Sequence, residues 1–189
     1  MNKLLFWGLV ILISLSACDN ASLTPAPTVD PPLESLSYDG PNENAPEFDP
    51  GTYEGAVRFP SNIISAFEGQ RLEKVQYYMA AKPSSVTIKV YLKSDDNIPD
   101  SLVYSAAVTS EVTANSWNEH TLSNPLTLDR NDLWVSVKFS HVDTLRSLGC
   151  DEGPAASNGD WVLLGGGWTT LRNAGPNINW NIRAIIGPS

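Results

Sequence analysis

The feature that most constrains the fold of this chain is a two-residue alternation of apolar and polar side chains. In residues 86–93, aliphatic side chains occupy every second position, and Tyr91 lies among the residues of the opposite face. Residues 133–139 repeat the pattern, with Trp134 on the opposite face. Successive side chains of a β-strand point to opposite sides of a sheet. Both segments are therefore predicted to be half-buried antiparallel strands.

Six further segments have the same character, at residues 53–59, 72–79, 102–109, 117–122, 161–164 and 178–186. Turn sequences rich in Gly, Pro, Asn and Asp separate them, and only residues 61–67 suggest a short helix. About eight antiparallel strands predict an all-β fold, a two-sheet β-sandwich of the jelly-roll kind. An open barrel is the structural alternative.

Composition divides the chain before this β-rich part. Residues 18–51 contain seven acidic residues and seven prolines but no Lys or Arg, which predicts a disordered acidic tether. Residues 52–189 hold the other 14 acidic residues and 11 basic ones, so the predicted β-sandwich domain is nearly neutral. Because it has no cluster of Lys and Arg, nucleic acid is excluded as an expected partner.

The first 17 residues have the layout of a secretory signal peptide. Lys3 supplies a positive charge, and the nearly continuous apolar run of residues 4–15 is shorter than the roughly 20 residues that a membrane-spanning helix needs. The segment ends in Leu15, Ser16, Ala17 and Cys18, which resembles the lipobox of bacterial lipoproteins. The resemblance implies cleavage before Cys18 and attachment of two or three acyl chains to that cysteine. The alternative is an ordinary secretory signal followed by an incidental cysteine.

Two or more acyl chains anchor a protein stably, so the membrane is an expected partner through the lipid. The resemblance implies a location in the cell envelope, with the outer membrane or the cell surface favoured. Asp19 resembles the inner-membrane retention signal of enterobacterial lipoproteins. An inner-membrane protein that faces the periplasm is therefore the alternative.

The sequence contains few groups suited to catalysis. His120 and His141 are the two histidines, and their spacing matches no common zinc motif. No G-x-S-x-G nucleophile elbow is present, and no pair of carboxylates stands out. Cys150 is interpreted as a small buried side chain, with a nucleophile or an intermolecular disulfide as the alternative. We therefore expect a protein that is not an enzyme, with a hydrolase as a remaining alternative.

No cofactor is expected except a structural calcium ion, because Ca²⁺ prefers oxygen ligands that polar loops supply. The preferred candidate cluster consists of Asp151, Glu152, Asn158 and Asp160. A second cluster consists of Asp95, Asp96, Asn97 and Asp100. Both also fit ordinary turns, in which short polar side chains bond to their own backbone.

The predicted last strand offers a candidate ligand-binding surface. Its apolar residues alternate with a polar row formed by Asn177, Asn179, Asn181 and Arg183. Amides beside a guanidinium can bind sugar hydroxyls or a peptide, and Trp134, Tyr91 or Trp168 could offer a stacking face. The alternatives are a solvated sheet face for the polar row and a lid over the sandwich for Trp168.

The β-rich part as a whole resembles the β-sandwich modules of secreted and surface proteins of Bacteroidota, some of which accompany gingipain-like peptidases or fibronectin type III repeats. The resemblance covers about residues 53–187. It rests on residues 55–59, 69–75, 86–91, 133–135, 149–154, 159–160 and 179–183, together with Trp117 and Leu122. It implies a non-catalytic adhesion or binding module with a glycan or protein ligand. A carbohydrate-binding lipoprotein that uses exposed aromatic side chains is the sharper alternative.

Overall fold

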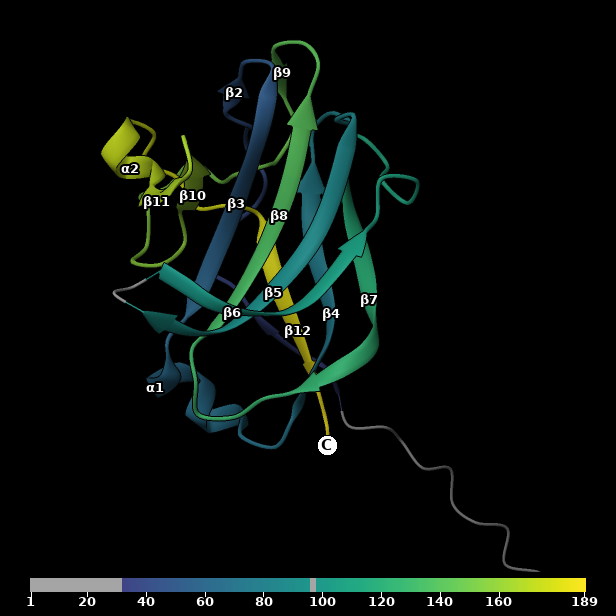
Figure 1. Cartoon of the computed structure of the whole chain (residues 1–189), viewed down its shortest axis with the longest axis vertical. Helices are drawn as coiled ribbons and strands as arrows, with labels where there is room; N and C mark the ends of the chain where they lie inside the picture. Colours follow the sequence, from purple (N-terminus) through teal and green to yellow (C-terminus); the bar gives the residue numbers. More distant parts are fainter. Residues whose placement is uncertain (1–31, 96–97) are drawn as a thin grey trace, which may run out of the picture. The chain divides into compact units, whose positions relative to one another are not determined.

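The computed structural model describes residues 32–95 and 98–189, and these residues form two facing antiparallel sheets (Figure 1). The six-stranded sheet has the order β11-β10-β3-β8-β5-β6. Its strands are β3 (Gly51–Phe59), β5 (Ser85–Asp95), β6 (Ile98–Ala107), β8 (Leu133–His141), β10 (Trp161–Leu164) and β11 (Gly167–Thr170). The predicted all-β sandwich is therefore confirmed, and the barrel alternative is not.

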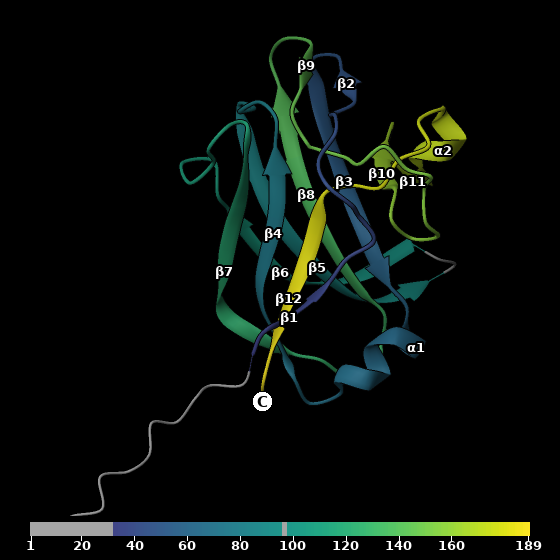
Figure 2. The same ribbon diagram turned by 180° about the vertical axis from the view of Figure 1, so that it is seen from behind.

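The four-stranded sheet has the order β1-β12-β4-β7 and lies in front when the molecule is seen from behind (Figure 2). Its strands are β1 (Glu34–Leu36), β4 (Arg71–Met79), β7 (Ser116–Thr127) and β12 (Ile182–Gly187). A small third sheet pairs β2 (Glu47–Phe48) with β9 (Leu145–Arg146). The helical turns are α1 (Ser61–Ile64), η1 (Ser65–Phe67) and α2 (Leu171–Ala174).

The core lies between the two large sheets, where the period-two pattern places the apolar side chains. Val86, Ile88 and Val90 of β5 are fully buried, and Val135 and Val137 of β8 pack in the same core. The predicted helix at residues 61–67 corresponds to α1 and η1. Alternation in the sequence therefore identified β5 and β8 and the face that each turns to the core, although β8 is buried on its other face as well. The short strands β1, β2, β9 and β11 were not predicted.

The predicted boundary of the domain is wrong, because residues 32–51 belong to the folded unit. They lie in one compact unit with the β-sandwich, and this unit includes β1, which pairs with β12. Tyr38 stacks on Phe59 with ring centroids 5.2 Å apart, and Ala45 is buried. We call residues 34–48 the N-terminal arm. The signal peptide, Cys18 and the rest of the predicted tether lie outside the described residues.

The last strand is shorter than predicted. Regular pairing begins at Ile182, and Trp180 makes only an isolated bridge to Cys150. Residues 148–150 lie beside both β4 and the segment before β12. Gly149 N–H donates to the Tyr78 carbonyl and Asn181 N–H donates to the Gly149 carbonyl, while Tyr78 N–H donates directly to the Asn181 carbonyl. Residues 177–181 are therefore a connecting segment rather than part of a strand. No helix in the described ranges is long and apolar enough to cross a membrane.

Candidate ligand-binding face

Aromatic residues gather on the outer face of the six-stranded sheet. Cross-strand pairing places Trp134 of β8 between Arg58 of β3 and Tyr91 of β5. Trp161 of β10 and Trp168 of β11 approach from the other edge of the sheet. We call this set of five residues the aromatic face. Three of them, Trp134, Tyr91 and Trp168, are among the ligand-binding residues predicted from the sequence.

The three indoles form one cluster. The ring centroid of Trp134 lies 5.1 Å from that of Trp161 and 5.9 Å from that of Trp168. Trp134 is fully buried, whereas Trp161 and Trp168 are half-buried. Trp134 thus forms the base of the cluster, and its two neighbours keep part of their aromatic surface in contact with solvent.

The β10–β11 hairpin brings Trp168 to this position. Gly165 and Gly166 form its turn with φ angles of 59° and 87°, a conformation that side chains other than glycine rarely adopt. Short strands joined by this tight turn let Trp161 and Trp168 lie over the face of the sheet. Trp134 is buried for this reason, although it points away from the main core.

A buried carboxylate lies on the same outer face. The Glu54 side chain is 1% exposed and accepts hydrogen bonds from Lys89 (2.9 Å), Tyr91 (2.8 Å) and Ser136 (2.7 Å). Burial alone would lower the pKa of Lys89, but its hydrogen bonds to Glu54 and Tyr91 raise that pKa. The Lys89 ammonium therefore stays protonated at neutral pH, 2.9 Å from the Glu54 carboxylate.

A second ion pair lies beside Trp134. The Arg58 guanidinium contacts the Asp132 carboxylate at 2.7 Å and lies over the Trp134 ring, 5.7 Å from its centroid. Asp132 also accepts the backbone N–H of Ser61 at 2.7 Å. The aromatic face therefore combines stacking surface with cationic and anionic groups that are held in place by hydrogen bonds.

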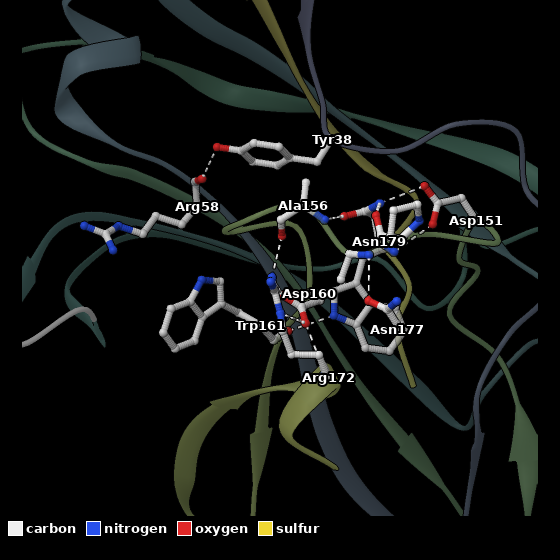
Figure 3. A network of polar contacts seen from close by, with 12 residues as sticks. Tyr38, Arg58, Asp151, Ala156, Asp160, Trp161, Arg172, Asn177 and Asn179 are labelled. Atoms are coloured by element: carbon white, nitrogen blue, oxygen red, sulfur yellow. Dashed lines mark hydrogen bonds and ion pairs between the residues drawn. The ribbon is translucent and has the colours of Figure 1, made fainter. Parts of the chain in front are cut away.

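An ion pair between Asp160 and Arg172 holds the β10–β11 hairpin in place; we call this ion pair the brace. The fully buried Asp160 carboxylate accepts hydrogen bonds from Arg172 Nε at 3.0 Å and Nη2 at 2.6 Å, and Arg172 also reaches the Ala156 carbonyl (Figure 3). The Leu171 N–H donates to the Asp160 carbonyl. These contacts tie α2 to the start of β10, and so they fix the hairpin that carries Trp161 and Trp168.

The predicted amide row does not form a binding surface. Asn179 and Asn181 are buried, whereas Asn177 is exposed and its side-chain amide oxygen accepts the Ala155 N–H. Asn179 donates to Asp151 and accepts the Ala156 N–H. This prediction is wrong because residues 177–181 leave the strand and use their amides to hold neighbouring loops.

Arg183 does point outward from β12, but its contacts are internal. Its guanidinium binds Asp39 of the N-terminal arm at 2.9 Å and stacks over Trp117, 4.0 Å from the ring centroid. The Asn181 amide also donates to Asp39 at 2.8 Å. Both residues secure the arm to the four-stranded sheet.

The structure does not assemble the preferred calcium cluster into a set of ligands. Asp151 accepts the N–H groups of Gly40, Gly153 and Asn179, which lower its pKa although burial alone would raise it. Asp160 is occupied by Arg172, and Glu152 is exposed. Asn158 supplies its backbone carbonyl to the Arg58 N–H. Within residues 32–95 and 98–189, no three or more His, Cys, Asp and Glu side chains are grouped to hold a metal ion.

The second candidate calcium cluster is only partly described. Asp96 and Asn97 lie outside the described residues, and Asp100 is exposed in β6.

Cys150 lines a cleft of about 400 Å³, together with residues of the N-terminal arm and the segments around residues 151 and 178. Its side chain is buried, and it forms no disulfide within the described residues. Burial and the neighbouring Asp151 raise the pKa of the Cys150 thiol to about 11. The thiol is therefore protonated at neutral pH, which agrees with the interpretation of Cys150 as a packed side chain.

The two histidines lie apart from the aromatic face. His120 bonds to the Tyr104 hydroxyl at 2.8 Å and contacts Glu111 at 3.3 Å. His141 is buried and bonds to Ser147, which is itself fully buried. Because Ser147 has no access to solvent, its pairing with His141 does not form an accessible nucleophile.

The sequence interpretation missed Glu54, Arg58 and Trp161. The alternation in residues 53–59 places Glu54 and Arg58 on the side opposite the apolar core, as it does Trp134 in residues 133–139. Their position on the face opposite the core was the available signal. The three-dimensional position of Trp161 had no such signal, because it depends on the fold of the hairpin.

Neither a protein-family model nor a curated protein sequence matches this chain. Solved structures that resemble it include two of the protein Cwp84. One is the clostridial cysteine protease Cwp84 after propeptide cleavage, with a TM-score of 0.62 and 12% identity over 83% of this chain. The other contains the cysteine protease and lectin-like domains of Cwp84, a surface-layer-associated protein of Clostridium difficile, with a TM-score of 0.50 and 13% identity over 73% of this chain.

This chain spans 40% and 32% of the two Cwp84 chains, respectively. At these identities the similarity establishes a shared fold.

Proposed function

We propose that this protein is a lipid-anchored module of the cell envelope that binds glycans through its aromatic face. The observation that carries the proposal is the cluster of three indoles beside Arg58 and the Glu54–Lys89 pair, all on the outer side of a sheet. Half-buried aromatic rings offer apolar surface to the C–H face of a sugar, and fixed polar groups nearby bind its hydroxyls.

The ion pairs beside the indoles favour a face that binds a glycan without cleaving it. Cleavage of a glycosidic bond uses two carboxyl groups, one as acid and one as base or nucleophile. The two carboxylates of this face are Glu54 and Asp132, and each is held in an ion pair with a cation, Lys89 or Arg58. A paired carboxylate is poorly suited to give up or take a proton, so both serve the architecture of the face.

The similarity to Cwp84 supports the same class of function. One of the two Cwp84 structures is described as containing a lectin-like domain, and an all-β module of this size matches a part of that chain rather than its whole. Together with the lipobox resemblance at Cys18, this supports a module that is presented at a membrane surface.

A glycan array and titration calorimetry with the purified protein test the binding proposal. Trp168→Ala should weaken binding of a glycan found on the array by about tenfold, the loss expected for one stacking contact of roughly 1.4 kcal/mol. Trp117→Ala is the matched control, because Trp117 lies on the opposite sheet and is 36% exposed. Absence of binding to any glycan, or equal losses in the two variants, would contradict the proposal.

Mass spectrometry and cell fractionation test the anchor. The mature protein should begin at Cys18 and carry acyl chains, and Cys18→Ser should move it from the membrane fraction to the soluble fraction. Membrane association of the Cys18→Ser variant would contradict lipid anchoring at this residue.

A further inference from the structure

A shallow pocket of about 280 Å³ adjoins the aromatic face. It is lined by Ser61, Lys93, Arg130, Asn131 and Asp132. Asp132 belongs both to this pocket and to the aromatic face, since it binds Arg58, and the Arg58 guanidinium lies over Trp134. A ligand of a few sugar units on the indoles could therefore extend into the pocket.

Lys93 has an unusual backbone conformation in this pocket. Its φ angle is 70°, which places it in the left-handed region that glycine tolerates and side chains rarely adopt. Its N–H donates to the Asp132 carbonyl at 3.0 Å, which holds β5 against the segment before β8. Strained residues of this kind concentrate at functional sites.

The Lys93 side chain is exposed, and no carboxylate in the described part of the chain forms an ion pair with it. Arg130 adds a second positive charge, and it pairs with Glu68 at 2.8 Å, where the Arg130 side chain is 76% exposed. The Asp132 carboxylate is already neutralised by Arg58. The pocket is thus positively charged in a chain with a formal net charge of −9.

We infer that the pocket binds the anionic group of an acidic saccharide, a carboxylate or a sulfate, while a neighbouring sugar ring stacks on the aromatic face. This inference rests on the proposed glycan-binding function and adds the class of ligand. The Lys93 ammonium and the Arg130 guanidinium supply charge-assisted hydrogen bonds, which are stronger than those between neutral groups.

Two matched pairs of probes test the inference by titration calorimetry with the full protein. The first pair is an oligogalacturonate and its methyl ester, and the second is dextran sulfate and dextran. The anionic member of one pair should bind at least tenfold more tightly than the neutral member at low salt. The preference should decline as the salt concentration rises, because salt screens exposed charges. The pair that shows the preference identifies the carboxylate or the sulfate as the group bound.

Substitution of Lys93 separates binding from folding. Lys93→Gly removes the charge and also suits the left-handed conformation, so the melting temperature should stay the same or rise while the affinity for the anionic probe falls about five- to tenfold. Lys93→Arg should retain most of the affinity. Lys82→Gln is the matched control, because Lys82 is an exposed lysine outside the pocket, and its substitution should leave the affinity unchanged.

The experiments distinguish failure of the anionic pocket from failure of glycan binding. If the esterified and acidic probes bind equally and Trp168→Ala weakens both, the inference about charge is overturned and glycan binding stands. If Lys82→Gln and Lys93→Gly have equal effects, the pocket is overturned as the site. If no probe and no glycan on the array binds, both proposals are overturned.

Discussion

At the scale of single residues, Glu54 shows how the outer face of the sheet is organised. Its carboxylate is almost fully buried on the side of β3 that faces away from the main core, and three donors converge on it, one from the adjacent strand β8 and two from β5 beyond it. Charge burial of this kind is costly unless both partners are present. The pair is therefore sensitive to loss of either member.

Glu54→Gln should lower the free energy of unfolding by about 3 kcal/mol, because it leaves the Lys89 ammonium without its counterion. Glu119→Gln is the matched control. Glu119 pairs with Lys74 at a site where both side chains are partly exposed, so its loss should cost less than about 1 kcal/mol. Urea unfolding curves of the two variants measure the difference, and equal costs would argue against a special role for Glu54.

His141 makes stability depend on pH. Burial lowers the pKa of His141 below its ordinary value of 6.5, although the contact with the Phe48 carbonyl partly opposes this. The unfolded chain therefore binds a proton at this site more readily than the folded chain. The contribution of His141 to the free energy of unfolding is fully present above about pH 6.5, and it decreases as the pH falls below that value.

Melting temperatures at pH 7.5 and 5.5 test this expectation. The wild-type protein should lose about 2–4 °C more than His141→Gln over this interval, which corresponds to about 1 kcal/mol for a domain of this size. His141→Gln retains a side chain that can hydrogen-bond to Ser147. An equal decrease in both proteins would show that other groups carry the pH dependence.

At the scale of elements, the β10–β11 hairpin contributes two of the three indoles of the candidate ligand-binding face. Its two-glycine turn and its brace to α2 place Trp161 and Trp168 against Trp134. The brace depends on Asp160, whose side chain has no contact with water.

Arg172→Met should loosen this hairpin, because the buried Asp160 carboxylate loses its counterion. Hydrogen exchange of the backbone amides in residues 161–170 should become faster, and the affinity for glycan should fall with it. Arg146→Met is the control, since Arg146 pairs with Glu47 at a site where both side chains are more than half exposed. Unchanged exchange in Arg172→Met would mean that the hairpin holds its position without the brace.

At the scale of the whole folded unit, the N-terminal arm is part of the domain. It adds β1 to the edge of the four-stranded sheet, stacks Tyr38 on Phe59 and pairs Asp39 with Arg183. The Asp39 side chain is fully buried in this pair. An edge strand that is covered in this way is also protected from pairing with other chains.

Truncation tests the contribution of the arm. A fragment of residues 31–189 should unfold at the same temperature as the longer chain, whereas a fragment of residues 52–189 should melt roughly 10 °C lower and aggregate more readily. Thermal unfolding followed by circular dichroism and light scattering measures both effects. Equal melting temperatures for the two fragments would show that the arm is dispensable.

Two aspects of the protein follow from the sequence by itself. The alternation in residues 86–93 and 133–139 identified the strands, their buried faces and the all-β class, because the direction of a side chain along a strand depends only on its position in the chain. The resemblance of residues 15–18 to a lipobox is also local, and it remains a prediction that lies outside the described residues.

The tertiary structure decided which side chains meet. Glu54 and Lys89 are 35 residues apart, and Asp39 and Arg183 are 144 residues apart, yet each pair forms an ion pair. The acidic, proline-rich composition of residues 18–51 predicted disorder because the sequence shows only the repulsion between acidic residues that are close along the chain. The free energy of folding depends instead on the charges that lie nearby in space, and Arg183 neutralises Asp39 only once β12 and the arm have come together.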